Sequence, residues 1–359
     1  MDAPTADALR ARERRDGSST IVCSGVHRSG RDRDREEAGL TIYLQPVADV
    51  WVAPFADATE LYSPWETEVE SWADLQHEIN TLGASYPDER FVWRGQADAS
   101  WGMRSSLYRA VANQISVAPT EGDLVAAERR LLDLARSQWR LDGIPGLQLF
   151  AQMQHVGVPT RLLDVTYNPL IAAWFAVTQS TLTSVDDADA RLFAFTVSPT
   201  NAVRLNSDWN SNTPYWFRLK SDNARQRTHW GTGLGRKLWH PPALHDRIPA
   251  QSAAFLLDGV PIEAPEHGFG RLHPGDPERW SPERLRQVSS IPMNMTNVRR
   301  GRLPVEKGPV FTYRVTAQAK PEIRDQLEKA FGYSFATVYA DIEGLAEYLR
   351  SRPGLLVGG

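Results

Sequence analysis

Cysteine is almost absent from this chain, because Cys23 is the single one among 359 residues. A disulfide within the chain is therefore excluded, and so is a cysteine-rich zinc site. The sequence also contains no run of about 18 apolar residues, so we expect no membrane span. The polar stretch 1–15 has no apolar segment behind it, which argues against a secretory signal and favours a cytoplasmic protein.

An excess of charge of either sign is also missing. The formal net charge is -4, charged residues make up 23% of the chain, and hydrophobic residues make up 42%. These values are ordinary for a folded protein and exclude global disorder. Without an overall basic surface, any contact with nucleic acid has to come from a local patch.

Residues 1–38 are predicted to form a disordered leader. They hold eight arginines interleaved with eight acidic residues and too few apolar residues to offset the entropy of ordering. An arginine-rich arm that contacts RNA is the alternative, and the interleaved acids weaken it. Residues 39–359 are predicted to form a single domain with a loop-rich insertion at about 261–307, where proline and glycine are frequent.

Hydrophobic periodicity predicts short helices and strands that follow one another without regular alternation. This pattern is typical of the α+β class, with small mixed or antiparallel sheets and flanking helices. We expect strands at 40–44, 91–93, 161–166, 191–197, 253–257 and 310–315. We expect helices at 71–82, 121–140, 147–155, 169–178, 321–331 and 342–350.

Several common catalytic motifs are absent. The chain has no dinucleotide fingerprint, no Gly-x-Ser-x-Gly elbow and no pair of histidines at metal-binding spacing on a helix. The glycine-rich stretch 231–237 lacks the spacing of a phosphate loop, and we interpret it as a flexible loop.

Polar residues instead gather in three segments. In the first, Arg94 follows an apolar strand and precedes Gly95 and Gln96, with Arg109 further on. An arginine in this position can present two N–H donors to a phosphate or carboxylate. The alternative is that it pairs with an internal carboxylate such as Asp164, because buried arginines are normally paired.

The second segment, 152–169, is the densest of the three. His155 ends a predicted helix, where a charged imidazole is favoured, although a hydrogen-bonded core histidine is the alternative. Thr166 and Asn168 precede the next helix, where they either bind a ligand oxygen or cap the helix. The third segment places Arg247 and Gln251 before a strand, where an ordinary sheet-edge turn is the alternative. Their joint clustering indicates a functional site.

These segments resemble the FRG-domain family, named for Phe-Arg-Gly. The triplet reads Trp-Arg-Gly at 93–95, and the run at 154–164 is similar to the family's most distinctive motif nearly residue for residue. An Arg/Gln/Phe pattern at 247–255 and a C-terminal motif at 339–346 resemble later parts of the family. The resemblance covers about residues 70–350 and implies that 39–359 is an FRG-type domain.

The resemblance further implies an ADP-ribosyltransferase-like core that uses NAD as a substrate. In that superfamily, a first-strand Arg or His holds NAD, a second-strand Ser or Thr lines the nicotinamide ribose, and a late Glu orients the ribose. Arg94 would then hold NAD, Thr166 would line the ribose, and Tyr167 or Trp174 would flank the nicotinamide. The late glutamate position holds Gln251, which cannot act as a base.

Two acidic residues are candidates for the role of the missing glutamate. Asp164 can support an oxocarbenium-like transition state, whereas Glu128 on the 121–140 helix is more simply interpreted as part of a surface salt bridge. We expect no metal. The predicted catalytic residues are Arg94, His155, Asp164, Thr166 and Gln251. The predicted NAD-binding residues are Arg94, Gly95, Gln96, Arg109, Thr160, Arg161, Thr166, Tyr167, Asn168 and Arg247.

Three functions follow as hypotheses. The first is an ADP-ribosyltransferase of a bacterial toxin or anti-phage defence system, which modifies nucleic acid or protein and is controlled by an antitoxin or regulatory partner. The second is a non-catalytic module that senses a nucleotide or RNA. The third is a metal-independent ribonuclease that uses His155 and Asp164 as acid and base.

Overall fold

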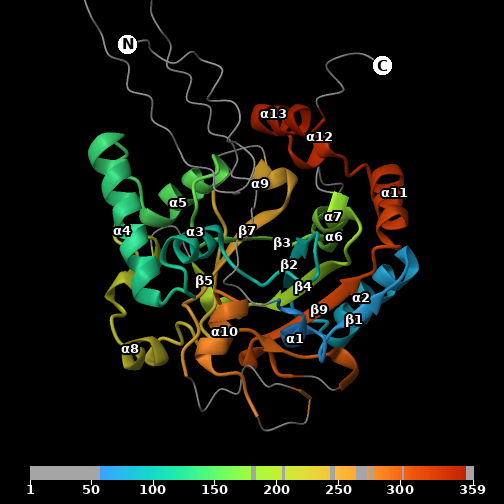
Figure 1. Cartoon of the computed structure of the whole chain (residues 1–359), viewed down its shortest axis with the longest axis horizontal. Helices are drawn as coiled ribbons and strands as arrows, with labels where there is room; N and C mark the ends of the chain where they lie inside the picture. The colour runs from blue at the N-terminus through green and yellow to red at the C-terminus, as the bar shows by residue number, and fades with distance from the viewer. Residues whose placement is uncertain are drawn as a thin grey trace, which may run out of the picture. The chain divides into compact units, whose positions relative to one another are not determined.

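The structure is a computed structural model, and it describes residues 57–178, 183–203, 207–242, 247–263, 273–274, 278–300 and 303–352. The predicted leader, Cys23 and the predicted strand at 40–44 lie outside the described residues. Helices surround one mixed β-sheet (Figure 1). The prediction of the α+β class, with a mixed sheet and flanking helices, is therefore confirmed.

Nine described strands form the sheet, in the order β1-β9-β4-β2-β3-β7-β6-β5, with β8 beside β9. β1 and β8 run parallel to β9, and β5 runs parallel to β6, whereas the other neighbours are antiparallel. The strands are β1 (Thr67–Val69), β2 (Phe91–Gln96), β3 (Leu163–Thr166), β4 (Ala190–Thr196), β5 (Ala202–Val203), β6 (Lys237–Trp239), β7 (Ala253–Leu257), β8 (Asn294–Met295) and β9 (Pro309–Val315).

The six predicted helices are all present, with ends within a few residues of those expected. They are α2 (Trp72–Ser85), α4 (Glu121–Gln138), α5 (Gly146–His155), α6 (Pro169–Val177), α11 (Lys320–Phe331) and α13 (Ile342–Ser351). The structure adds α1 (Thr59–Tyr62), α3 (Ser106–Ile115), α7 (Thr183–Asp186), α8 (Asp222–Arg227), α9 (Arg247–Ala250), α10 (Pro282–Val288) and α12 (Phe335–Val338). Among the described helices, none is both long enough and apolar enough to cross a lipid bilayer.

Side-chain caps explain where the predicted helices begin. The Ser71 hydroxyl accepts a hydrogen bond from the Asp74 amide and so starts α2. At α6, Asn168 Oδ1 accepts from the Leu170 amide at 2.9 Å, and proline occupies the first turn. Both caps satisfy amide groups that have no partner inside the helix.

The sheet packs against helices on both faces. On β2, Val92 belongs to an apolar cluster with residues of α1 and α10, whereas Trp93 belongs to a cluster with residues of α2, α6 and α11. This alternation is what a strand buried on both faces requires. Gly95 lets α6 approach β2 closely, because a Cβ at that position would lie 2.0 Å from the carbonyl oxygen of Ala172.

A third apolar cluster joins α4 and α5 to β6 and β7. It contains Trp216, Trp230 and Trp239, all fully buried, while Trp209 is half-buried beside them. The glycine-rich stretch 231–237 is not a loosely held loop, since Thr232 is fully buried and its hydroxyl donates to the carbonyl of His229. Within 261–307, the described residues include α10 and β8.

Candidate functional site

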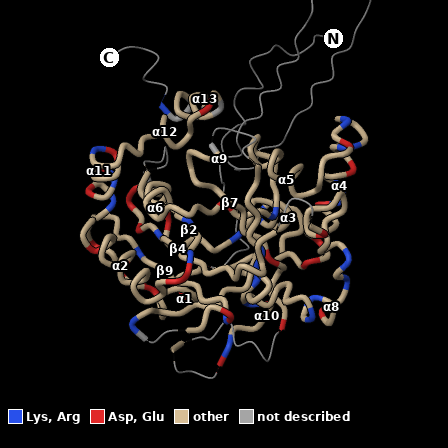
Figure 2. Tube along the Cα trace, turned by 180° about the vertical axis from the view of Figure 1, so that it is seen from behind, with Lys and Arg blue, Asp and Glu red and all other residues tan. Residues whose placement is uncertain are grey.

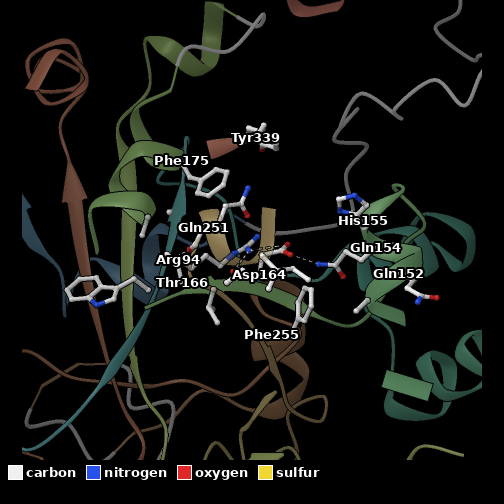
Figure 3. Close-up of a pocket in the computed structure, with 17 residues that line it drawn as sticks. Arg94, Gln152, Gln154, His155, Asp164, Thr166, Phe175, Gln251, Phe255 and Tyr339 are labelled. Atoms are coloured by element: carbon white, nitrogen blue, oxygen red, sulfur yellow. Dashed lines mark hydrogen bonds and ion pairs between the residues drawn. The ribbon is translucent and has the colours of Figure 1, made fainter. Parts of the chain in front are cut away.

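A pocket of about 370 Å³ opens at the centre of the sheet, between β2 and β3 (Figure 3). In the described part of the sheet, these strands share one register pair, Trp93 with Thr166. Past that pair, β2 lines the pocket with Arg94 and β3 lines it with Asp164. Helices α5 and α6, strand β7 and the segment after α12 complete the walls. The site therefore lies where two neighbouring strands of one sheet separate.

Arg94 lies in the middle of the pocket in Figure 3. Its Nη1 donates to the backbone carbonyl of Asp164 at 2.8 Å and lies 3.9 Å from the Asp164 carboxylate. Withdrawal from water lowers the pKa of Arg94, the Asp164 carboxylate opposes this shift, and Arg109 adds to it. The buried Nε has no hydrogen-bond partner among the described residues. Arg94 is therefore anchored at one nitrogen and retains N–H groups for an anionic ligand.

A chain of hydrogen bonds fixes the position of Asp164. The Leu162 amide donates to Thr160 Oγ1 at 3.2 Å, and that hydroxyl donates to Gln154 Oε1. The amide of Gln154 is thereby oriented so that its Nε2 donates to Asp164 Oδ1 at 2.7 Å. The Asp164 side chain is 67% exposed, yet it is held beside Arg94 by this relay. Thr160 does not line the pocket, and it acts through Gln154 instead.

Thr166, the last residue of β3, is hydrogen-bonded to Gln251, which lies two residues before β7. Thr166 Oγ1 donates to the backbone carbonyl of Gln251 at 2.6 Å and accepts from the Asn168 amide at 3.0 Å. The side-chain Nε2 of Gln251 donates to the carbonyl of Val338 at 3.0 Å. Both residues line the pocket, and the bond to Val338 holds the end of α12 beside the pocket wall.

Aromatic rings stand at two ends of the pocket. Phe175 of α6 and Tyr339 lie on one side with ring centroids 5.9 Å apart, and Phe255 of β7 lies on the other (Figure 3). His155 lines the wall near Gln154, and its Nε2 lies 3.8 Å from a carboxylate oxygen of Asp341. The polar centre is thus flanked by apolar surfaces on which planar rings can pack.

The structure brings together six of the residues predicted from the sequence: Arg94, Gly95, His155, Asp164, Thr166 and Gln251. Six others lie outside the pocket walls: Gln96, Arg109, Thr160, Arg161, Tyr167 and Asn168. Gln96 is buried with Nε2 donating to the Gly102 carbonyl, Arg109 donates to the Arg104 carbonyl, and Asn168 caps α6. Tyr167 lines a different groove, and the side chain of Arg247 is outside the described residues.

Arg161 and Glu128 form a buried ion pair away from the pocket. Arg161 is 4% exposed and Glu128 is 1% exposed, so the prediction of a surface salt bridge at Glu128 is wrong. Arg161 donates to Glu128 through Nε and Nη2 at 2.6 and 2.8 Å, and to Glu121 through Nη1 at 2.9 Å. Trp216 and Trp230 donate their indole N–H groups to the same two carboxylates. The pair holds α4 against β3 and β7, and neither residue lines the pocket.

Sequence reasoning did not assign a ligand role to four pocket residues: Gln154, Phe175, Phe255 and Tyr339. It placed Tyr167 or Trp174 beside the ligand, but Trp174 is buried against Phe335 and Tyr339, and its neighbour Phe175 faces the pocket. Gln154, Phe255 and Tyr339 each belong to a motif on which the family resemblance rests. Membership of a motif was therefore the signal in the sequence that could have identified them as pocket residues. The register of each helix and strand decided whether the side chain faces the pocket.

Comparison with protein families agrees with this site. The model of the FRG domain matches residues 89–184, a range that includes β2, α5, β3 and α6 and twelve of the 17 residues that line the pocket. The chain therefore contains an FRG domain over this range, as the motifs predicted. Neither the curated proteins nor the solved structures give a match to the chain.

The charged groups of the pocket are few. Asp164 is the acidic residue among the described residues that line it, and Arg94 is the basic one apart from His155. Across the described parts of the chain, no three side chains of His, Cys, Asp or Glu come together in a way that could hold a metal ion. The chemistry that the described pocket offers comes from one guanidinium, one carboxylate, one imidazole, amides and a hydroxyl.

Proposed function

We propose that this FRG-domain protein binds NAD in the pocket around Arg94 and transfers the ADP-ribose part of NAD to a macromolecule. The observation that carries the proposal is the order of the pocket surfaces, with aromatic rings at two ends and a guanidinium between them. A dinucleotide has the matching order, since two ring systems flank a central diphosphate. Arg94 presents N–H donors of the kind that bind phosphate oxygens.

In this proposal, the bond between the nicotinamide nitrogen and ribose C1′ breaks, and nicotinamide leaves. Nicotinamide takes the electron pair of the broken bond, a nucleophile of the acceptor forms a bond to C1′, and the proton of that nucleophile passes to solvent. The developing positive charge on the ribose favours a nearby carboxylate, and Asp164 is the acid that the described pocket supplies. Thr166 and Gln251 offer hydrogen bonds to the ribose. Phe175 and Tyr339 offer a face to the nicotinamide.

A non-catalytic nucleotide-binding module is the second candidate. The observation that favours it is the side-chain amide of Gln251, which already donates to the carbonyl of Val338. The resemblance assigns Gln251 to the position at which the superfamily has glutamate. An amide cannot accept a proton from an attacking nucleophile. In either case, the expected setting is a bacterial toxin or anti-phage defence system in the cytoplasm, with an antitoxin or regulatory partner.

The experiment that tests both uses NAD labelled in its ADP-ribose part. Purified wild-type protein, Arg94→Ala and Arg130→Ala are incubated with the NAD and a bacterial lysate, and label is measured in RNA, DNA and protein. Arg130 is an exposed arginine of α4 outside the pocket and serves as the control. We expect transfer by the wild type and the control, and none by Arg94→Ala while its circular dichroism spectrum is unchanged.

Each other outcome has a meaning. Binding of NAD without turnover, weakened about 10- to 150-fold in Arg94→Ala, supports the binding module, because that is the range for one hydrogen bond to a charged group. Absence of NAD binding to the folded wild type contradicts both candidates. Loss of RNA without NAD indicates the ribonuclease hypothesis.

A further inference from the structure

We propose that a second groove, lined by Arg90, Tyr167 and His240, binds single-stranded nucleic acid. The groove has a volume of about 660 Å³ and begins where β2 begins, on the other side of the Trp93–Thr166 pair from the pocket. Trp93 lines both cavities. The proposal concerns binding alone and holds whether or not the pocket consumes NAD.

The floor of the groove is apolar and largely aromatic. It consists of Leu82 from α2 and of Phe91 and Trp93 from β2, all of which are at most 9% exposed. At the rim, the ring of Tyr167 lies 5.8 Å from the ring of His240, centroid to centroid. Bases stack on such rings without regard to sequence, because every base has a π-face.

The charge on the rim is positive. Arg90 is exposed and makes no ion pair with any residue that the structure describes. Its charge reaches the groove, because it lowers the pKa of the Tyr167 hydroxyl against the larger rise caused by burial. The neighbouring acids Asp88 and Glu89 do not line the groove, and neither does any other acid in the described part of the chain.

Because the chain has a net charge of -4 and no overall basic surface, binding of nucleic acid has to occur at a local site. Figure 2 shows basic and acidic residues intermixed along α4 and α11, so these helices present no surface of one sign. The groove joins aromatic rings to the guanidinium of Arg90, which makes no ion pair with a described residue. It thereby supplies both contacts of a single strand: stacking for a base and a cation for a phosphate. A peptide partner would require donors and acceptors for its backbone, which the floor of this groove does not offer.

The rim of the groove is held in a fixed shape. Ser252 has a φ of 46°, a left-handed conformation that is uncommon for a residue other than glycine. Its carbonyl accepts a hydrogen bond from the Tyr167 amide at 3.1 Å. Such outliers persist where the surrounding structure requires them, often at ligand sites. Tyr167 follows β3 directly, and its position is therefore also fixed by Ser252, the residue before β7.

The test uses the full chain and fluorescein-labelled 12-nucleotide single strands of DNA and RNA, without NAD. Fluorescence anisotropy gives the affinity over a series of salt concentrations for wild type, Arg90→Ala, Tyr167→Ala, His240→Ala and the control Arg130→Ala. We expect Tyr167→Ala to weaken binding about 5- to 150-fold, the effect of losing one stacked base. We expect Arg90→Ala to reduce the salt dependence, log K against log salt, by about 0.7.

Cross-linking locates the strand directly. An oligonucleotide with 4-thiouridine is irradiated on the wild type, and the modified peptides are identified by mass spectrometry. A cross-link at Tyr167 or His240 supports the proposal. The proposal is overturned if no strand binds, or if binding is unchanged in all three groove variants, in which case the contact lies elsewhere on the chain. Failure of NAD binding leaves this result unaffected, so the two proposals fail separately.

Discussion

Arg161 and Glu128 share two hydrogen bonds, at 2.6 and 2.8 Å, in a part of the interior where both are almost completely buried. They are 33 residues apart, and the pair connects the start of β3 to the middle of α4. The Arg161 guanidinium also lies over the rings of Trp216 and Trp230. A residue that looks like a ligand contact in the motif thus stabilises the wall behind the pocket.

Removal of one partner of this pair should destabilise the protein strongly. We expect Glu128→Ala to lower the free energy of unfolding by about 3–5 kcal/mol, because Arg161 is left charged and buried without that carboxylate. Urea denaturation measures the change. The matched control is Glu283→Ala, which removes an exposed pair with Arg286 and should cost at most about 1 kcal/mol. Equal effects would show that Glu128 is not buried.

The contact between Gly95 and α6 should not tolerate a side chain. A Cβ on Gly95 would lie 2.0 Å from the Ala172 carbonyl oxygen, so we expect Gly95→Ala to cost about 3 kcal/mol or more, because backbone has to move. Gly122→Ala is the control, since the nearest atom would lie at 3.6 Å and alanine favours the helix. Thermal unfolding compares the two. A neutral Gly95→Ala would contradict the close packing.

Gln154 should act as a positioning residue for Asp164. Gln154→Met keeps the size of the side chain and removes both hydrogen bonds of its amide, so we expect NAD to bind about 5- to 10-fold more weakly. Gln152→Met is the control, because Gln152 lines the same pocket without a hydrogen bond to any described residue. Isothermal titration with NAD measures both affinities, and a comparable loss in Gln152→Met would refute the relay.

Asp258 should make stability fall as the pH rises from 4 to 6. Burial raises the pKa of this carboxyl to about 6, although Oδ1 accepts from the amides of Gly231 and Gly259 at 2.7 Å each. Between the unfolded pKa, about 3.9, and the folded pKa, the native state binds more protons than the unfolded state. The proton linkage therefore removes about 3 kcal/mol of stability over this range and no more above it.

The comparison variant is Asp258→Asn, which keeps the oxygen that accepts both amides. Urea denaturation from pH 4 to 8 gives the unfolding free energy of both proteins. We expect the value for Asp258→Asn minus the value for the wild type to rise up to about pH 6 and to stay constant above it. Taking the difference cancels the titration of the other carboxyl groups. A difference that does not depend on pH would show that Asp258 titrates normally.

Local patterns predicted most of the secondary structure. The hydroxyl cap at Ser71 and the Asn-Pro pair at 168–169 begin helices through contacts within three residues, so the sequence contains the whole cause. Strand β7 was predicted with the same ends that the structure has. The three polar segments also met at one pocket, because each lies at an end or a crossing of the central strands.

Contacts between distant residues could not be predicted in this way. A surface salt bridge was expected at Glu128, yet Glu128 is buried, whereas Trp139 directly after α4 is 64% exposed. A single helix pattern shows which residues share a side, but not which neighbour covers each of them. Glu128 is buried because Arg161 and Trp216 approach it from other segments.

The sequence by itself determined the helices and strands, the FRG-domain motifs and the central position of Arg94, since these depend on short-range geometry and on residue type. Only the tertiary structure decided which polar residues of a motif face the pocket. In the described sheet, β2 and β3 share one register pair, Trp93 with Thr166, and the pocket and the groove lie on either side of it. Thr166 therefore lines the pocket, whereas Tyr167, the next residue along the chain, lines the groove. The packing of α4, α6 and the segment after α12 around the sheet then directed Arg161 inward and brought Phe175 and Tyr339 to the pocket.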